Sequence, residues 1–126
     1  MSDHAYDLYQ RGMAFLESGH PAQAAVLFER ARRLEPDKAS IREALGRAYF
    51  NYGQYDLAKH HFEKAISIDP TNDYAHFGVA LSLQRLGRFV PAAGHIKLAL
   101  AMSPQNESYQ ELARRLLVDK AVRKKG

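Results

Sequence analysis

Histidine is the residue type in this sequence that most directly suggests chemistry, because a neutral imidazole is a common metal ligand. The chain has six histidines and no cysteine. His60 and His61 are adjacent, so on a helix their side chains would point about 100° apart and could not easily bind one ion together. His61 and His95 are 34 residues apart, but no further imidazole or carboxylate accompanies them in a known ligand pattern. The sequence therefore predicts no metal site and no cofactor.

The motifs of the common enzyme classes are missing from the sequence. There is no Gly-x-x-x-x-Gly-Lys loop that would hold a phosphate, and no Gly-x-Ser-x-Gly turn that would present a nucleophilic serine. Cysteine nucleophiles are excluded because the chain has no cysteine. We therefore expect a protein that is not an enzyme.

Aromatic, apolar and arginine side chains recur at helical spacing in three separate segments. Their composition is typical of the core of a protein interface, where aromatic residues, Met and Arg are enriched. A surface of this kind would bind a protein or peptide partner that is itself apolar or amphipathic. The candidate peptide-binding residues are Tyr6, Tyr9, Met13, Leu16, Arg47, Phe50, Tyr74, Phe77, Leu81 and Arg85.

Within this set, four aromatic residues are the expected anchors for a helical or extended segment: Tyr9, Phe50, Tyr74 and Phe77. Two arginines of the set would bind acidic or carbonyl groups of the same segment. The alternative is that these side chains pack on neighbouring helices or cover one another, because single apolar residues on a surface are common.

The elements that must position these residues follow from an internal repeat. An interval of 34 residues predicts three helix-turn-helix units, 5–38, 39–72 and 73–106, followed by a capping helix over 107–123. We therefore expect a single all-α domain, an α-solenoid. The interval relates five sets of residues: Pro36, Pro70 and Pro104; Gly19, Gly53 and Gly87; Ala24, Ala58 and Ala92; Phe28, Phe62 and Ile96; and Ala31, Ala65 and Ala99.

Each repeated residue type has an expected structural role. Glycine tolerates the left-handed conformation that ends a helix, so the glycines should end the first helix of each unit. Proline removes a backbone donor, so the prolines should follow the second helices. Asp37 and Thr71 then become the expected N-caps of the next helices. The alanines should permit close helix packing, with Phe28, Phe62 and Ile96 filling the space between helices.

The residues at these offsets resemble those of the tetratricopeptide repeat family. The resemblance covers nearly the whole chain, and it implies that the first helix of each unit lines a concave groove. Two features of the family pattern are altered. Leu8, Arg42 and His76 stand where the family often has tryptophan, and Ala80 replaces the glycine that is present as Gly12 and Gly46.

Some members of this family hold the C-terminal carboxylate of heat-shock chaperones with a clamp of Lys, Asn, Asn, Lys and Arg. The matching residues here are Tyr9, Met13, Ala44, Tyr74 and Gly78, and none donates the charged hydrogen bonds that such a clamp requires. The sequence thus argues against chaperone-tail binding by that mechanism. The aromatic lining instead favours an apolar segment, similar in kind to the ligands of three-repeat bacterial secretion chaperones.

The net charge of +4 is confined to the C-terminal end of the sequence. Residues 114–126 hold six Lys or Arg against one Asp, whereas the rest of the chain is close to neutral. These cations complement the dipole of the last helix, and we expect no specific nucleic-acid binding.

Apolar runs such as Leu98–Met102 have five residues, too short for a membrane span. The lack of cysteine fits a reducing compartment, which predicts a cytoplasmic location.

Self-association is the alternative function that the sequence leaves open. The first unit begins at Ala5, so we expect no capping segment in front of it. Repeat arrays without a polar cap tend to bury the open end. The protein would then be a scaffold that buries its groove or its first repeat in a homo-oligomer.

Overall fold

The computed structural model describes the backbone of residues 1–125 and the side chains of residues 1–118. The described residues form seven α-helices and no β-strand, which confirms the predicted all-α solenoid. The basic side chains beyond Val118, and any ion pairs they make, lie outside the described part. The helices are α1 (Asp3–Glu17), α2 (Pro21–Leu34), α3 (Ala39–Asn51), α4 (Tyr55–Ile68), α5 (Asp73–Arg85), α6 (Phe89–Met102) and α7 (Glu107–Lys125).

The turn inside each helix pair contains a glycine with a positive φ angle. Gly19, Gly53 and Gly87 have φ values of 82°, 86° and 76°, which side chains with a Cβ rarely adopt. They follow α1, α3 and α5, as predicted from their spacing.

The predicted N-caps at Asp37 and Thr71 are wrong, because both helices begin further along the chain. Lys38 precedes α3 and makes no side-chain cap bond. Asn72 precedes α5, and its Oδ1 accepts a hydrogen bond from the Ala75 backbone N–H at 2.9 Å. Thr71 instead donates two hydrogen bonds, from its hydroxyl and from its backbone N–H, to the carboxylate of Asp69.

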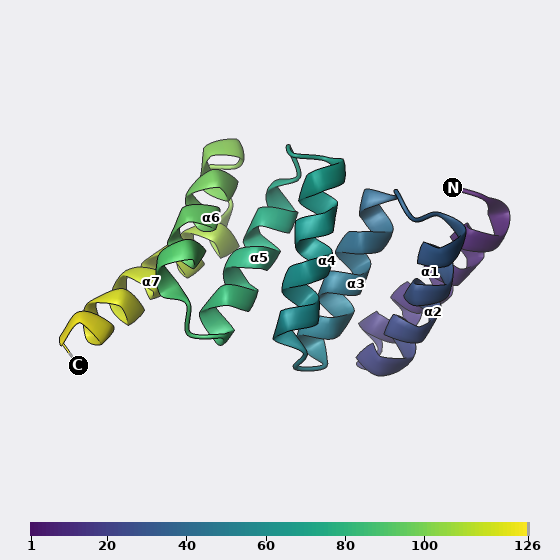
Figure 1. Cartoon of the computed structure of the whole chain (residues 1–126), viewed down its shortest axis with the longest axis horizontal. Helices are drawn as coiled ribbons and strands as arrows, with labels where there is room; N and C mark the ends of the chain where they lie inside the picture. Colours follow the sequence, from purple (N-terminus) through teal and green to yellow (C-terminus); the bar gives the residue numbers. More distant parts are fainter. Residues whose placement is uncertain (126) are drawn as a thin grey trace.

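The helices are stacked side by side in two rows, with the two chain termini at opposite ends of the stack (Figure 1). In one row, α1 contacts α3, α3 contacts α5, and α5 contacts α7. In the other row, α2, α4 and α6 make no contact with one another. The row that begins with α1 is therefore the inner, more tightly spaced row, and its exposed face is the groove of the solenoid. Among the described residues, no helix has both the length and the apolarity that crossing a membrane requires.

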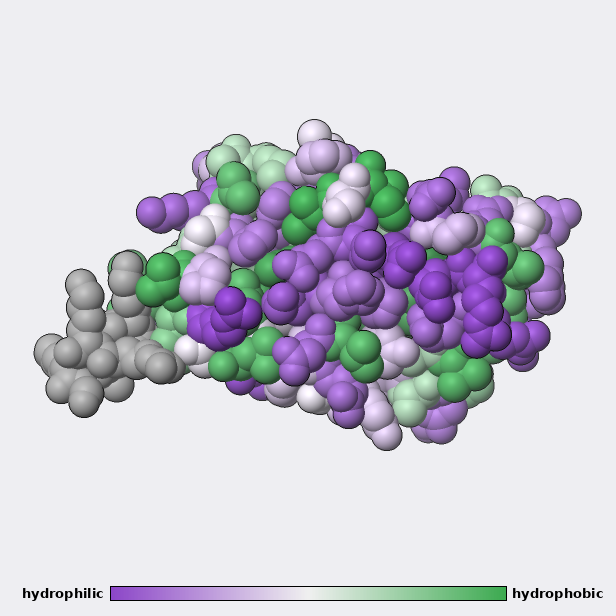
Figure 2. All heavy atoms as spheres, viewed as in Figure 1, coloured by the Kyte–Doolittle hydropathy of each residue, from purple (hydrophilic) through white to green (hydrophobic). Residues whose placement is uncertain are grey.

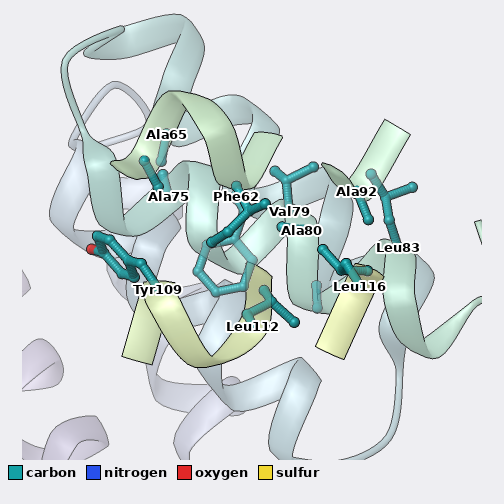
Figure 3. Packing of buried hydrophobic residues seen from close by; sticks show 13 residues of the cluster. Phe62, Ala65, Ala75, Val79, Ala80, Leu83, Ala92, Tyr109, Leu112 and Leu116 are labelled. Carbon is teal, nitrogen blue, oxygen red and sulfur yellow. The ribbon is translucent and has the colours of Figure 1, made fainter. Parts of the chain in front are cut away.

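The core contains the repeated alanines together with Phe28, Phe62 and Ile96, each at most 2% exposed. One cluster of buried residues joins α1, α2 and α3, and a second joins α4 to α7. Phe62 lies in the middle of the second cluster, among side chains of α5 and α7 (Figure 3). The predicted packing roles of these residues are confirmed.

Candidate functional site

The ten candidate peptide-binding residues all lie on the inner row of helices, where α1, α3 and α5 carry them. We call them the groove stripe. Tyr6 and Arg85 are exposed, whereas Tyr9, Met13, Arg47, Phe50, Tyr74, Phe77 and Leu81 are half-buried. Leu16 differs from the rest because it is only 6% exposed and belongs to the core cluster of α1, α2 and α3. It offers little surface to a ligand.

The middle of the groove combines two tyrosines with a carboxylate and a guanidinium. Burial raises the pKa of Tyr9, with a further rise from Glu43 and an opposing effect from Arg47. The pKa of Tyr74 is also raised by burial, and the same two charged residues act on it. Both tyrosines therefore lie within electrostatic reach of Glu43 and Arg47 on α3. Asn72 fixes the carboxylate of Glu43 with a hydrogen bond of 3.0 Å, while Arg47 makes no ion pair among the described side chains.

The guanidinium of Arg85 lies over two aromatic rings. Its guanidinium carbon is 5.5 Å from the centre of the Phe50 ring and 5.9 Å from that of Tyr55. The two rings meet edge to face at 5.2 Å. Such cation–π contacts orient the guanidinium while leaving its edge free to donate hydrogen bonds.

A continuous row of aromatic rings connects the third repeat with the last helix. Tyr74 lies 6.2 Å from Phe62 and 6.1 Å from Phe77, and Phe77 lies 4.8 Å from Tyr109. These distances are typical of interacting aromatic pairs. The row packs the groove stripe against α4 and α7: Phe62 and Tyr109 are buried, whereas Tyr74 and Phe77 are half-buried and keep some exposed surface.

Asp73 joins α5 to α6 and α7. Its Oδ2 accepts hydrogen bonds from the hydroxyls of Ser103 at 2.8 Å and Tyr109 at 2.9 Å. The bond from Ser103 is the main cause that lowers the pKa of Asp73. Burial is the main cause that raises the pKa of Tyr109, and the neighbouring carboxylate of Asp73 raises it further. This pair of bonds positions α7 beside the groove.

A hollow of about 300 Å³ lies where the groove stripe meets α7, and we call it the groove hollow. Glu111 lies on its rim and forms ion pairs with Arg114 at 2.8 Å and Arg115 at 3.4 Å. A second hollow of about 510 Å³ adjoins it and shares Glu111 and Arg115. The floor is apolar and the rim is charged, so the hollow suits one apolar side chain of a bound segment. Its lining residues are Phe77, Leu81, Glu107, Ser108, Glu111, Leu112 and Arg115.

Comparison with known families agrees with this architecture. A family model described as tetratricopeptide repeat matches residues 9–71, and a second model with the same description matches residues 50–116. This chain belongs to the tetratricopeptide repeat family.

Solved tetratricopeptide repeat domains superpose on almost the whole chain. The first repeat domain of Spaghetti (RPAP3), bound to the HSP90 peptide SRMEEVD, is 16% identical with a TM-score of 0.92, and 96% of each chain is covered. The Sgt2 domain of Aspergillus fumigatus is also 16% identical, with a TM-score of 0.93, covering 99% of this chain and 84% of that one. The type III secretion chaperone SycD of Yersinia enterocolitica, in complex with a peptide of the translocator YopD, is 25% identical. Its TM-score is 0.82, and the match covers 99% of this chain and 96% of SycD.

The tetratricopeptide repeat groove also contains residues that the sequence did not single out. Tyr55 supports Arg85, and Asn72 fixes Glu43. Leu112 of α7 lines the groove hollow. None of these roles follows from the spacing within one helix, because each depends on a contact between helices. Within the described part of the chain, no three His, Asp or Glu side chains gather as a metal-binding group.

Proposed function

We propose that this tetratricopeptide repeat domain is a non-catalytic interaction module that binds a peptide or helical segment of a partner protein in its groove. The observation that carries the proposal is the set of half-buried aromatic rings in the groove stripe, which keep exposed surface beside a hollow with an apolar floor. Tyr9, Phe50, Tyr74 and Phe77 are the proposed anchors. Arg47 and Arg85 would bind carbonyl or acidic groups of the segment.

The chemistry of the groove favours an apolar or amphipathic segment over a C-terminal carboxylate. RPAP3 and SycD each bind a peptide, but this chain has Tyr9 and Met13 at positions where a carboxylate clamp needs Lys and Asn. Gly78, at the position of the clamp arginine, faces the Phe62 ring. The ligand proposed here therefore resembles that of a secretion chaperone more closely than a heat-shock tail.

Removal of two anchors at opposite ends of the groove tests the proposal. We expect a Tyr9→Ala plus Phe77→Ala variant to bind peptides selected on the wild-type domain at least about 30-fold more weakly, since truncation of a hot-spot aromatic costs about 2 kcal/mol or more. Peptides would be selected from a displayed random library, and the affinities measured by calorimetry.

The matched control for this experiment is Leu57→Ala. Leu57 is a 43% exposed apolar residue on α4 that belongs neither to the groove stripe nor to the groove hollow. Circular dichroism must show that both variants are folded. Unchanged peptide affinity in the folded double variant would rule out the groove as the binding site.

Self-association is the second candidate function, and the outer face of α6 is the observation that favours it. Val90, Leu98 and Met102 are 67%, 48% and 39% exposed and lie on one side of the helix with Gly94. In α4 the residues 34 positions before Val90 and Leu98 are Asp56 and Lys64. A face without these charges can pack against the same face of a second copy around a two-fold axis.

We expect a Leu98→Lys variant, which restores the charge found at Lys64, to remain monomeric at concentrations where the wild-type chain dimerises through α6. Sedimentation velocity over a concentration series measures this difference. Wild-type protein that stays monomeric at the highest concentration would exclude self-association.

A further inference from the structure

A hollow of about 440 Å³ lies between α2 and the C-terminal end of α3, and it shares no residue with the groove stripe or the groove hollow. We call it the junction hollow, because it lies where the first repeat meets the second. Its lining residues are Ala22, Ala25, Val26, Glu29, Arg30, Arg33, Tyr49 and Tyr52.

Short side chains on α2 are the reason that the junction hollow exists. The residues 34 positions after Ala22, Ala25 and Val26 are Asp56, Lys59 and His60 on α4. There the long side chain of Lys59 runs along the helix and pairs with Glu63 at 3.2 Å. Alanine at position 25 cannot fill the same space, so the first junction stays open.

Apolar and aromatic surface forms the walls of the junction hollow. Val26 is 62% exposed and Tyr52 is 58% exposed, although both are large apolar side chains. Tyr49 is half-buried and stacks on His61 with ring centres 5.4 Å apart. Burial raises the pKa of Tyr49, so its hydroxyl stays neutral at physiological pH. A rigid ring beside exposed apolar surface favours a ligand with an apolar or aromatic side chain.

Two arginines without an acidic partner lie at the rim of the junction hollow. Arg30 and Arg33 are exposed and form no ion pair among the described residues. The one carboxylate in the lining, Glu29, is bound by Arg32 at 3.0 Å and does not neutralise them. In later repeats the position of Arg33 is taken by Ser67 and Ala101. Figure 2 shows strongly hydrophilic side chains gathered over α2, beside the hydrophobic patches of the same face.

We infer that the junction hollow is a second binding site, and that it takes an acidic protein segment with an apolar or aromatic side chain. The apolar side chain enters between Tyr49, Tyr52 and Ala25. Carboxylates on both sides of it pair with Arg30 and Arg33, which are otherwise uncompensated. A partner bound here leaves the groove free, so the domain can hold two segments at once.

The probe for this site is a fluorescein-labelled peptide in which one phenylalanine is flanked on each side by four glutamates. We expect it to bind the full chain with an affinity that falls with added salt, because exposed charges are screened. A peptide with alanine in place of phenylalanine should bind at least about 5-fold more weakly, since the apolar contribution is lost. In protein NMR spectra, the largest shifts should fall on Tyr49, Tyr52 and Ala25.

Two variants with a matched control decide the assignment. Ala25→Lys fills the hollow with the residue that the second repeat carries at Lys59, and Arg30→Gln plus Arg33→Gln removes the cations. Each should weaken binding of the peptide about 10-fold or more, whereas Lys64→Gln, at the register of Arg30 on α4, should not. The inference is overturned if the folded arginine variant binds like wild type, or if the spectral shifts map to the groove stripe. Tighter binding of a single-stranded oligonucleotide than of the peptide would also overturn it.

Discussion

A Phe62→Ala variant should lose about 3–5 kcal/mol of unfolding free energy, the range measured when a large aromatic side chain is removed from a core. Phe62 is 2% exposed and belongs to the cluster that joins α4 to α7. An added Cβ at Gly46 would come within 2.8 Å of its ring, and one at Gly78 within 2.6 Å. The ring thus packs directly against the backbones of α3 and α5, and no smaller side chain can fill that space.

Urea unfolding monitored by circular dichroism measures this loss. Because domains of this kind are stable by only about 5–15 kcal/mol, this loss removes a large part of the total stability. The exposed Leu57→Ala variant is the control, and it should change stability by no more than about 0.5 kcal/mol. A loss below about 1 kcal/mol for Phe62→Ala would contradict the central position of this ring.

The glycines opposite Phe62 allow a sharper version of the same test. Gly78→Ala in the wild-type chain should be destabilising because the new methyl group meets the ring. In the Phe62→Ala background the ring is absent, and the same change should become neutral or stabilising, since alanine favours a helix over glycine by about 1 kcal/mol. A double-mutant cycle measures this change of sign. Equal effects in both backgrounds would show that the ring does not explain the glycine.

The fold could be predicted from the sequence because each marker of the repeat acts locally or through contacts that recur in every unit. Gly53 ends a helix whatever surrounds it, and Ala58 permits close packing in the same way as Ala24. The helix starts could not be predicted in the same way, because Thr71 and Asn72 are both residue types that cap helices and only the course of the chain decides between them.

The candidate site was predicted less completely, because helical spacing describes one helix at a time. Leu16 falls on the groove stripe by spacing, yet it belongs to the buried cluster that joins α1, α2 and α3. The junction hollow depends on the length of the side chain at position 25 compared with position 59, and on two tyrosines of another helix. Comparison of the same position in each repeat could have indicated it, whereas its volume required the structure.

Two positions in each repeat carry apolar residues in the first repeat and titratable residues in the second and third. The pair is Leu8 and Leu27 in the first repeat, both buried. In the second repeat the same positions hold Arg42 and His61, whose Nη1 and Nδ1 atoms are 3.4 Å apart. In the third they hold His76 and His95, whose Nδ1 atoms are 3.2 Å apart.

The pKa of His61 is lowered from 6.5 to about 4, mainly by burial, with smaller lowering effects of His60, Arg42 and Arg32 and an opposing effect of Glu29. The pKa of His95 is also lowered, first by burial and then by His76. Both imidazoles are therefore neutral in the folded protein at pH 7. The unfolded chain binds protons at these residues more readily, so the stability they contribute is complete above pH 6.5 and is lost as the pH falls, in the case of His61 towards its folded pKa of about 4.

The wild-type chain should consequently lose about 2 kcal/mol of unfolding free energy through His61 alone between pH 7.5 and pH 5. An Arg42→Leu plus His61→Leu variant, copied from the pair Leu8 and Leu27, should lose correspondingly less over the same range. At pH 5 the carboxylate of Asp73 is still ionised, because its pKa is lowered from 3.8, so the bonds that hold α7 do not contribute to the difference.

Urea unfolding at both pH values, with the exposed His4→Leu variant as control, measures the effect. Since the leucine pair removes the buried imidazole without leaving Arg42 unpaired, an equal pH dependence in the variant and the wild-type chain would show that His61 is not the source of the acid sensitivity.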